Sequence, residues 1–171
     1  MKDTMLAVAG LMELAARTAP KAGGRDFVGS KVVSGEDLKT LADAMERYGQ
    51  EKGVVNFDRD AANVRRSDAV LLLSLDQPNT LGLNCGACGY SRCADLKPEE
   101  GPEFVGPLCA WRVLDLGIAL GSAAKTAGIL NADNRIMYRV GVAARKIGMI
   151  KGELVVGIPI SATGKSIYFD R

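Results

Sequence analysis

The spacing of apolar residues predicts a helix at the start of the chain. In the first stretch they recur every three or four positions, as on the buried face of a helix: Met5, Val8, Ala9 and Met12. We expect this helix to end near Ala19, because Pro20 cannot continue it.

A short apolar segment, "FVGSKVV", precedes a second predicted helix. The buried stripe of that helix would consist of Leu38, Leu41, Ala42 and Met45. Ser34 and Asp37 have the spacing of a variant capping box, because their side chains can each satisfy a free backbone N–H at the start of the helix.

Two later segments are continuously apolar, as expected for strands covered on both faces: "DAVLLLSL" and "GELVVGIPI". Between them, "CAWRVLDLGIALGSAAKTAGIL" is apolar on nearly all sides, which predicts a helix in the middle of the molecule. Its small residues would let another backbone approach closely: Gly117, Gly121, Ser122 and Ala123. A further helix is expected from about Asn134 to Ile147, and "SIYFDR" is expected to form a terminal strand that crosses to a second subunit. Helices and strands without regular alternation indicate an α+β sandwich.

Composition and charge narrow the function classes. The 171 residues include 22 Lys and Arg against 20 Asp and Glu, and the basic residues are scattered, so we expect no nucleic acid or membrane partner. The apolar runs fall short of the about 20 residues that span a bilayer. Glu13 and Arg17 interrupt the first run, unlike a signal peptide. We therefore expect a cytoplasmic protein, in which cysteines serve as metal ligands more often than as disulfides.

The four cysteines form the strongest chemical signal in the chain. Three lie in "NCGACGYSRC" and the fourth begins the long apolar helix: Cys85, Cys88, Cys93 and Cys109. Four thiolates complete the ligand set of a [4Fe–4S] cluster, three from one tight loop and one from elsewhere. Gly86 and Gly89 would let the loop close and direct its N–H groups at the sulfides.

Two other kinds of site use the same residue type. A structural zinc site with four thiolates is chemically possible, although such sites more often pair two CxxC sequences. A thioredoxin-like redox pair would use Cys85 and Cys88 but would leave Cys93 and Cys109 unexplained. The spacing therefore favours the iron–sulfur cluster.

The cysteine sequence also resembles a known pattern. "CGACGYSRC" with a distant fourth cysteine is similar to the [4Fe–4S] motif of corrinoid iron–sulfur proteins and of electron-transport subunits of anaerobes. The segment "ADLKPEEGPEFVGPL" before the last cysteine contains three prolines, so we expect it to be a loop.

Both ends of the chain resemble nitroreductase-fold flavoproteins. The first helix with its following loop, and the ending "ARKIGMIKGELVVGIPISATGK", match the pattern of that fold. The whole chain resembles an uncharacterised family of ferredoxin-domain proteins from anaerobic bacteria and archaea. The resemblance implies a nitroreductase-like three-layer α+β sandwich and a homodimer. It also implies a single domain over residues 1–171, in which segment 76–110 is the iron–sulfur insertion.

The resemblance further implies a bound FMN. In nitroreductases the FMN lies at a dimer interface, and carried over by position its binding residues are Arg17, Thr18, Lys21, Gly157, Ser161 and Lys165. Cations and backbone N–H groups suit a phosphate dianion. A structural alternative is that Arg17 complements the C-terminus of the first helix and that Lys21 is a solvated side chain.

The sequence contains no catalytic acid–base set, since it has no histidine and no serine in a nucleophile-elbow pattern. Any reaction would therefore belong to the cofactors. We expect a redox protein that passes electrons between a [4Fe–4S] cluster and a flavin, with an unidentified redox partner. The alternative is a non-enzymatic module in which the cluster, or zinc, is structural or senses oxygen and the flavin cleft is empty.

Overall fold

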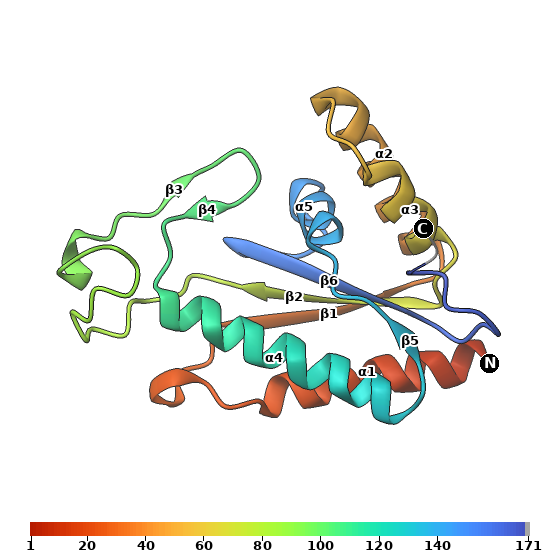
Figure 1. Cartoon of the computed structure of the whole chain (residues 1–171), viewed down its shortest axis with the longest axis horizontal. Coiled ribbons are helices and arrows are strands. Elements are labelled where there is room, and N and C mark those ends of the chain that lie inside the picture. Colours follow the sequence, from red (N-terminus) through yellow and green to blue (C-terminus); the bar gives the residue numbers. More distant parts are fainter. Residues whose placement is uncertain (170–171) are drawn as a thin grey trace.

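A four-stranded antiparallel sheet lies between two groups of helices, which gives three layers (Figure 1). The computed structural model describes residues 1–169. The helices are α1 (Lys2–Thr18), α2 (Glu36–Lys52), α3 (Phe57–Arg65), α4 (Ala110–Ile129) and α5 (Tyr138–Lys146). The strands are β1 (Val28–Ser34), β2 (Ala69–Leu75), β3 (Glu99–Glu100), β4 (Val105–Gly106), β5 (Asp133–Asn134) and β6 (Leu154–Ser161). This arrangement confirms the predicted α+β class.

The sheet has the strand order β1-β2-β6-β5, and each face is covered by helices. Helices α1 and α4 cover one face, whereas α2, α3 and α5 cover the other (Figure 1). The core consequently has two halves that share the sheet.

Strand β2 is continuously apolar because both of its faces are buried. Successive side chains of a strand point to opposite faces. Leu71 and Leu73 therefore join the core under α1 and α4, while Val70 and Leu72 join the core under α2 and α5. All seven residues of β2 are buried, and each buried leucine contributes about 1.5–3 kcal/mol of transfer free energy. The prediction of a strand covered on both faces is confirmed.

The predicted capping box at the start of α2 is wrong. Ser34 is the last residue of β1 and pairs with Ala69 in the sheet. Gly35 occupies the N-cap position with a φ of 61°, and no side chain caps this helix end. Pairing within the sheet holds Ser34 in extended backbone, so its hydroxyl does not act as the cap. Helix α3, which the apolar spacing did not indicate, follows α2 directly.

The long apolar helix, α4, lies on the surface rather than in the middle of the molecule. One side packs on the sheet through Leu116 and Ala119, but the opposite side exposes Leu114 and Ile118. Gly117 lies on this open side, where an added Cβ would meet nothing within 4 Å. The prediction of a central helix is therefore wrong, because the sheet covers only one side of α4.

Three predictions about the last third of the chain need correction. The helix expected from about Asn134 begins at Tyr138, because Asp133 and Asn134 pair with the end of β6 as strand β5. The expected terminal strand is not formed by residues 166–169. Tyr168 is buried in the core of its own chain, where burial raises the pKa of its hydroxyl to about 12. Residues 170 and 171 of that predicted strand lie outside the described residues.

The cysteine-containing segment leaves the body of the molecule after β2 and returns at α4. Contrary to the expectation of a loop, part of it forms the two-stranded hairpin β3–β4, which projects beside the sheet (Figure 1). Arg145 of α5 fixes this hairpin, because its guanidinium donates to both carboxylate oxygens of Glu100 at 2.7 Å. The same pairing holds the pKa of Glu100 below its ordinary value.

Among the described residues, no helix combines the length and the apolar character needed to cross a membrane.

Candidate metal centre

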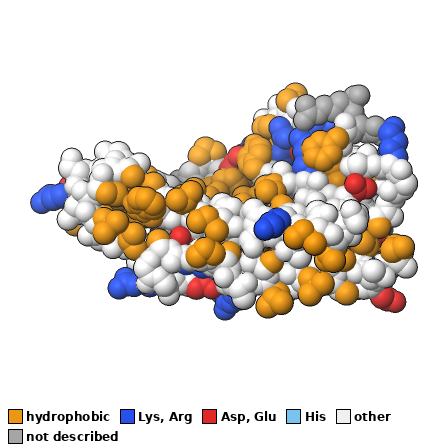
Figure 2. All heavy atoms as spheres, turned by 60° about the horizontal axis from the view of Figure 1, so that its bottom comes forward, with side chains coloured by type: hydrophobic (Ala, Val, Ile, Leu, Met, Phe, Trp, Pro, Cys, Tyr) orange, Lys and Arg blue, Asp and Glu red, His pale blue; other side chains and the backbone are white. Residues whose placement is uncertain are grey.

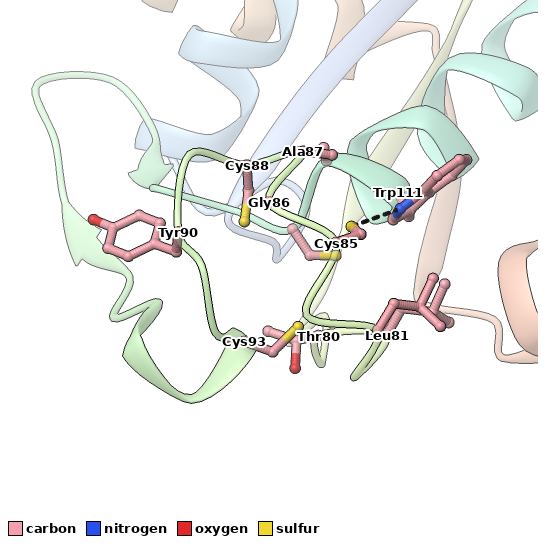
Figure 3. A pocket seen from close by; sticks show the side chains of 12 residues that line it. Thr80, Leu81, Cys85, Gly86, Ala87, Cys88, Tyr90, Cys93 and Trp111 are labelled. Atoms are coloured by element: carbon pink, nitrogen blue, oxygen red, sulfur yellow. Dashed lines mark hydrogen bonds between the residues drawn. The ribbon is translucent and has the colours of Figure 1, made fainter.

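All four cysteines line one hollow at the N-terminus of α4. Thr80 and Trp111 also contribute to the wall of this hollow. Figure 3 shows that the sulfurs of Cys88 and Cys93 point into the space that the loop encloses. Cysteines that are 24 positions apart in the sequence, from Cys85 to Cys109, thus meet in space.

The loop that carries Cys85, Cys88 and Cys93 is fixed by Asn84. The backbone N–H of Cys93 donates to Asn84 Oδ1 at 2.8 Å, and the backbone N–H of Asn84 donates to Cys93 Sγ at 3.4 Å. This reciprocal pair closes the loop into a ring. Asn84 has a φ of 49°, a left-handed conformation that asparagine tolerates better than most residues.

The two glycines of the loop also adopt left-handed backbone. Gly86 has a φ of 75° and Gly89 a φ of 89°, and the N–H of Gly89 donates to the carbonyl of Gly86 at 2.9 Å. Side chains other than glycine rarely adopt these angles. The predicted role of both glycines in letting the loop turn tightly is therefore supported by the backbone.

Cys109 reaches the hollow from the N-cap position of α4. Its thiol is buried, and its carbonyl accepts the N–H groups of Arg112 and Val113 at 3.0 and 3.1 Å. The N-terminus of a helix carries a partial positive charge from its aligned peptide dipoles. A long helix thus directs this charge toward the four thiols, which favours negative charge in the hollow.

Trp111, in the first turn of α4, contacts the cysteine loop directly. Its indole N–H donates to Cys85 Sγ at 3.3 Å (Figure 3). Hydrogen bonds from the Ala87 backbone and from this indole lower the pKa of the exposed Cys85 thiol. Sequence reasoning missed Trp111. The available signal was that the only tryptophan of the chain lies two positions after a predicted ligand.

A buried ion pair joins the start of α4 to two loops. Arg112 is fully buried, pairs with Asp115 at 2.9 Å and lies over the ring of Phe27. It donates to the carbonyls of Asn79 at 3.0 Å and of Ala22 at 2.8 Å. Its third nitrogen, Nη2, has no hydrogen-bond partner among the residues that the structure describes. The pair therefore fixes the segment that enters the cysteine loop.

The spacing of the cysteines differs from that of a site for a single ion. Within residues 1–169, no three His, Cys, Asp or Glu side chains lie close enough together to hold one metal ion. The four thiols nevertheless face the same hollow.

The predicted FMN-binding residues near α1 are engaged within the chain. Arg17 contacts Asp26 at 3.3 Å, and Lys21 Nζ donates to the carbonyl of Arg17 at 2.6 Å. Thr18 donates to the carbonyl of Leu14 at 3.0 Å. Arg17 and Lys21 thus lie at the C-terminal end of α1. For Arg17, this agrees with the alternative that it complements the C-terminus of the first helix. Lys21, in contrast, is buried rather than solvated, because its ammonium satisfies helix carbonyls.

The other predicted FMN-binding residues lie in and after β6. Gly157 packs beneath α5, where an added Cβ would lie 2.3 Å from Val140 Cγ1. Ser161 is fully buried at the end of the strand, and Lys165 is exposed in the segment that follows. Gly157 is therefore in contact with protein on the side where its Cβ would project.

The residues near α1 lie at one end of the sheet, whereas Ser161 lies at the other end and Gly157 pairs with Leu72 in the middle. The guanidinium of Arg17 donates to the carbonyl of Val28, the first residue of β1. Ser161 lies at the other end, because the residue before it pairs with β2 at the position where β2 pairs with Ser34, the last residue of β1. A strand of this length spans about 20 Å at about 3.3 Å per residue. Within one chain these residues consequently do not meet, and their binding of FMN at a dimer interface stays a prediction.

Comparison with known proteins connects this chain to two groups. Residues 105–171 match the family model described as "Uncharacterized protein containing a ferredoxin domain (DUF2148)". A protein of Archaeoglobus fulgidus, described as "Uncharacterized protein", is 49% identical over 163 residues, which cover 94% of this chain and 88% of the relative. These findings confirm the resemblance recognised in the sequence.

Solved structures of nitroreductases share the fold. Nitroreductase CinD from Lactococcus lactis has a TM-score of 0.60 at 13% identity, covering 96% of this chain and 84% of that chain. Nitroreductase A from Vibrio parahaemolyticus has a TM-score of 0.59 at 11% identity, covering 94% and 59%. The chain thus spans less than two thirds of the length of the latter. The similarity confirms the nitroreductase-like fold, and at this identity it shows the fold alone.

Proposed function

This chain belongs to the family of uncharacterized proteins that contain a ferredoxin domain, and we propose that it is an electron-transfer protein with a [4Fe–4S] cluster. The observation that carries the proposal is that all four cysteines line one hollow: Cys85, Cys88, Cys93 and Cys109. When bound, the cluster would accept and release one electron at a time. The proposal includes the predicted single domain over residues 1–171, with segment 76–110 as the cluster-binding insertion.

The number of thiols and their sequence pattern support a cluster over zinc. Four sulfurs on one zinc ion would lie about 3.8 Å apart, because each Zn–S bond is about 2.3 Å in a tetrahedron. A cubane separates its ligands further, since each thiolate binds a different iron. The four thiols that line the hollow provide one ligand for each iron of a cubane.

The exposure of the hollow supports electron transfer over a purely structural cluster. Cys85 is exposed, and Trp111 beside it is 39% exposed. An electron that leaves through this side crosses little protein. An oxygen-sensing cluster that breaks down on oxidation is distinguished by redox behaviour, since an electron carrier must cycle reversibly between two states without losing iron.

Metal analysis tests the proposed cofactor. Protein purified without oxygen should contain about four iron and four sulfide per chain, because four thiolates complete one cubane. Stoichiometric zinc with no sulfide would overturn the proposal and support the zinc alternative. Stepwise reduction and reoxidation, followed by a second iron assay, separates a reversible carrier from an oxygen sensor that loses its cluster.

The flavin that the resemblance implies would have to lie between two copies of the chain, because the predicted residues lie apart within one chain. Arg17 and Lys21 bind groups of their own chain at the end of the sheet opposite Ser161. A site built from both groups would need a second copy of the chain. Absorbance and fluorescence of the supernatant after denaturation, for protein expressed with riboflavin, test this point directly.

We also propose a homodimer that forms through the outer face of α1 and α4. Figure 2 shows hydrophobic side chains over this face, and the exposed ones include Leu14, Leu114, Ile118 and Ile129. The open space at Gly117 lets a second backbone approach closely. Sedimentation velocity at several concentrations tests this assembly, and a monomer at all of them would contradict it. The redox partner is a further, unidentified protein.

Substituting Asn84 should loosen the cysteine loop. Asn84→Ala removes a hydrogen bond worth about 1 kcal/mol and places alanine in left-handed backbone at a cost of about 1 kcal/mol. We therefore expect a chelator to remove iron from this variant at least about tenfold faster, since about 1.4 kcal/mol corresponds to a factor of ten. Asn84→Asp keeps the acceptor oxygen and serves as the matched control, with a rate near that of the wild type. Equal rates for both variants would show that the ring closed by Asn84 does not limit iron loss.

A further inference from the structure

Trp111 is the residue of α4 that contacts a cysteine sulfur through its side chain. It follows Cys109 by two positions, and its indole N–H donates to Cys85 Sγ at 3.3 Å. The indole therefore joins the thiol that comes from the loop to the helix that carries the buried thiol. Trp111 and Leu83 both line the hollow and are both exposed.

The surrounding structure fixes this contact. Arg112, the next residue, is fully buried and is held by Asp115 and by the carbonyl of Asn79. The first turn of α4 thus has a fixed position relative to the segment that enters the cysteine loop. Cys93 Sγ also accepts a hydrogen bond, but from the backbone N–H of Asn84. The donor at Cys85 is a side chain, so substitution can remove it without changing the backbone.

We propose that Trp111 is a positioning residue that raises the reduction potential of the cluster through its hydrogen bond to Cys85. The proposal rests on the proposed [4Fe–4S] function. Hydrogen bonds to the sulfurs are among the factors that set the potential of an iron–sulfur cluster. The added electron increases the negative charge on the thiolate sulfurs, and hydrogen bonds to charged acceptors are stronger than those to neutral ones. The indole N–H therefore stabilises the reduced state more than the oxidised state.

An isosteric tryptophan analogue tests this effect. Because Trp111 is the only tryptophan, growth on benzothienylalanine, in which sulfur replaces the indole N–H, changes the protein at this position alone. The ring keeps its shape and loses its donor. In a titration with dithionite as the one-electron reductant, followed by EPR, we expect the ratio of reduced to oxidised cluster at a fixed potential to fall at least about threefold. For a one-electron couple this is a shift of about 28 mV to more negative potential, at about 59 mV per factor of ten.

The Trp111→Phe variant separates the hydrogen bond from shielding by the ring. Phenylalanine lacks the donor and also covers less of the hollow, so water would approach Cys85 and oppose the shift. A potential shifted to more negative values in the analogue supports the proposal, and the difference between the analogue and Trp111→Phe measures the shielding by the ring. An analogue with the potential of the wild type overturns it.

Iron and sulfide content distinguishes failure of the proposed [4Fe–4S] function from failure of the proposed role of Trp111. If wild-type protein binds no iron–sulfur cluster, the proposed function fails and no potential exists to compare. If wild type and analogue both bind four iron and four sulfide but have equal potentials, only the role of Trp111 fails. Quenching of the single tryptophan emission during reconstitution gives an independent measure of how close the cluster lies to the indole.

Discussion

Cys109→Ser protein is expected to lose the cluster while keeping its fold. Substitutions that only support metal ligands commonly cost about 10-fold to 100-fold in affinity, so the loss of a ligand should lower iron and sulfide content by at least about tenfold. Serine is a favourable N-cap residue, so α4 should still begin at the same place. The measurements are iron and sulfide content after anaerobic reconstitution, together with far-UV circular dichroism.

A matched control separates ligand loss from disturbance of the hollow. Thr80 lines the same hollow but has no thiol, so Thr80→Ser should retain iron and sulfide at the wild-type level. Alanine has no atom that could replace the thiolate, so full iron and sulfide in Cys109→Ala would show that Cys109 is not the fourth ligand. Because Cys109 is the buried cysteine and is far from the other three in sequence, it is the ligand whose assignment depends most on the tertiary structure.

Arg112→Met should be the most destabilising substitution near the site. It leaves the carboxylate of Asp115 buried without its cation, and breaking a buried pair in this way costs about 3–5 kcal/mol. It also removes the donor to the carbonyl of Asn79, so the cysteine loop loses an anchor. Urea denaturation of the cluster-free protein, monitored by circular dichroism, measures the change in the free energy of unfolding.

Two further variants show whether the loss of stability in Arg112→Met comes from the buried ion pair. Arg65 forms its pairs with Asp43 and Glu46 at the exposed surface, and Arg65→Met should cost no more than about 1 kcal/mol. The double variant with Arg112→Met and Asp115→Leu removes both buried charges and should be more stable than Arg112→Met alone. A loss below about 1 kcal/mol for Arg112→Met would mean that the buried pair does not stabilise this region.

Some features of the site followed from the sequence because they depend on local chemistry. The spacing of Cys85, Cys88 and Cys93 places three thiols on one short loop, and Gly86 and Gly89 adopt the left-handed backbone that such a loop requires. The number and type of potential ligands are properties of the residues themselves. They therefore need no knowledge of distant contacts.

The remaining features of the site depend on residues that are distant in sequence. Trp111 donates to a sulfur 26 positions away, and Arg112 binds a carbonyl 33 positions away. In the sequence, Arg112 is one polar residue in an apolar stretch, and only the loops that fold over α4 show that it is buried. The predicted FMN residues are a different case, because the sheet holds Arg17 and Ser161 apart in one chain and the resemblance places their site at a dimer interface.

The fold divides in the same way between sequence and tertiary structure. The sequence by itself determined α1, the buried stripe of α2 and strands β2 and β6, because their apolar periodicity reports burial directly. Only the tertiary structure decided that α4 has an open face, that β5 replaces the start of the expected helix, and that Gly35 caps α2. Each of these depends on which element lies alongside, and the free energy of such long-range contacts exceeds the weak local preferences that a sequence pattern measures.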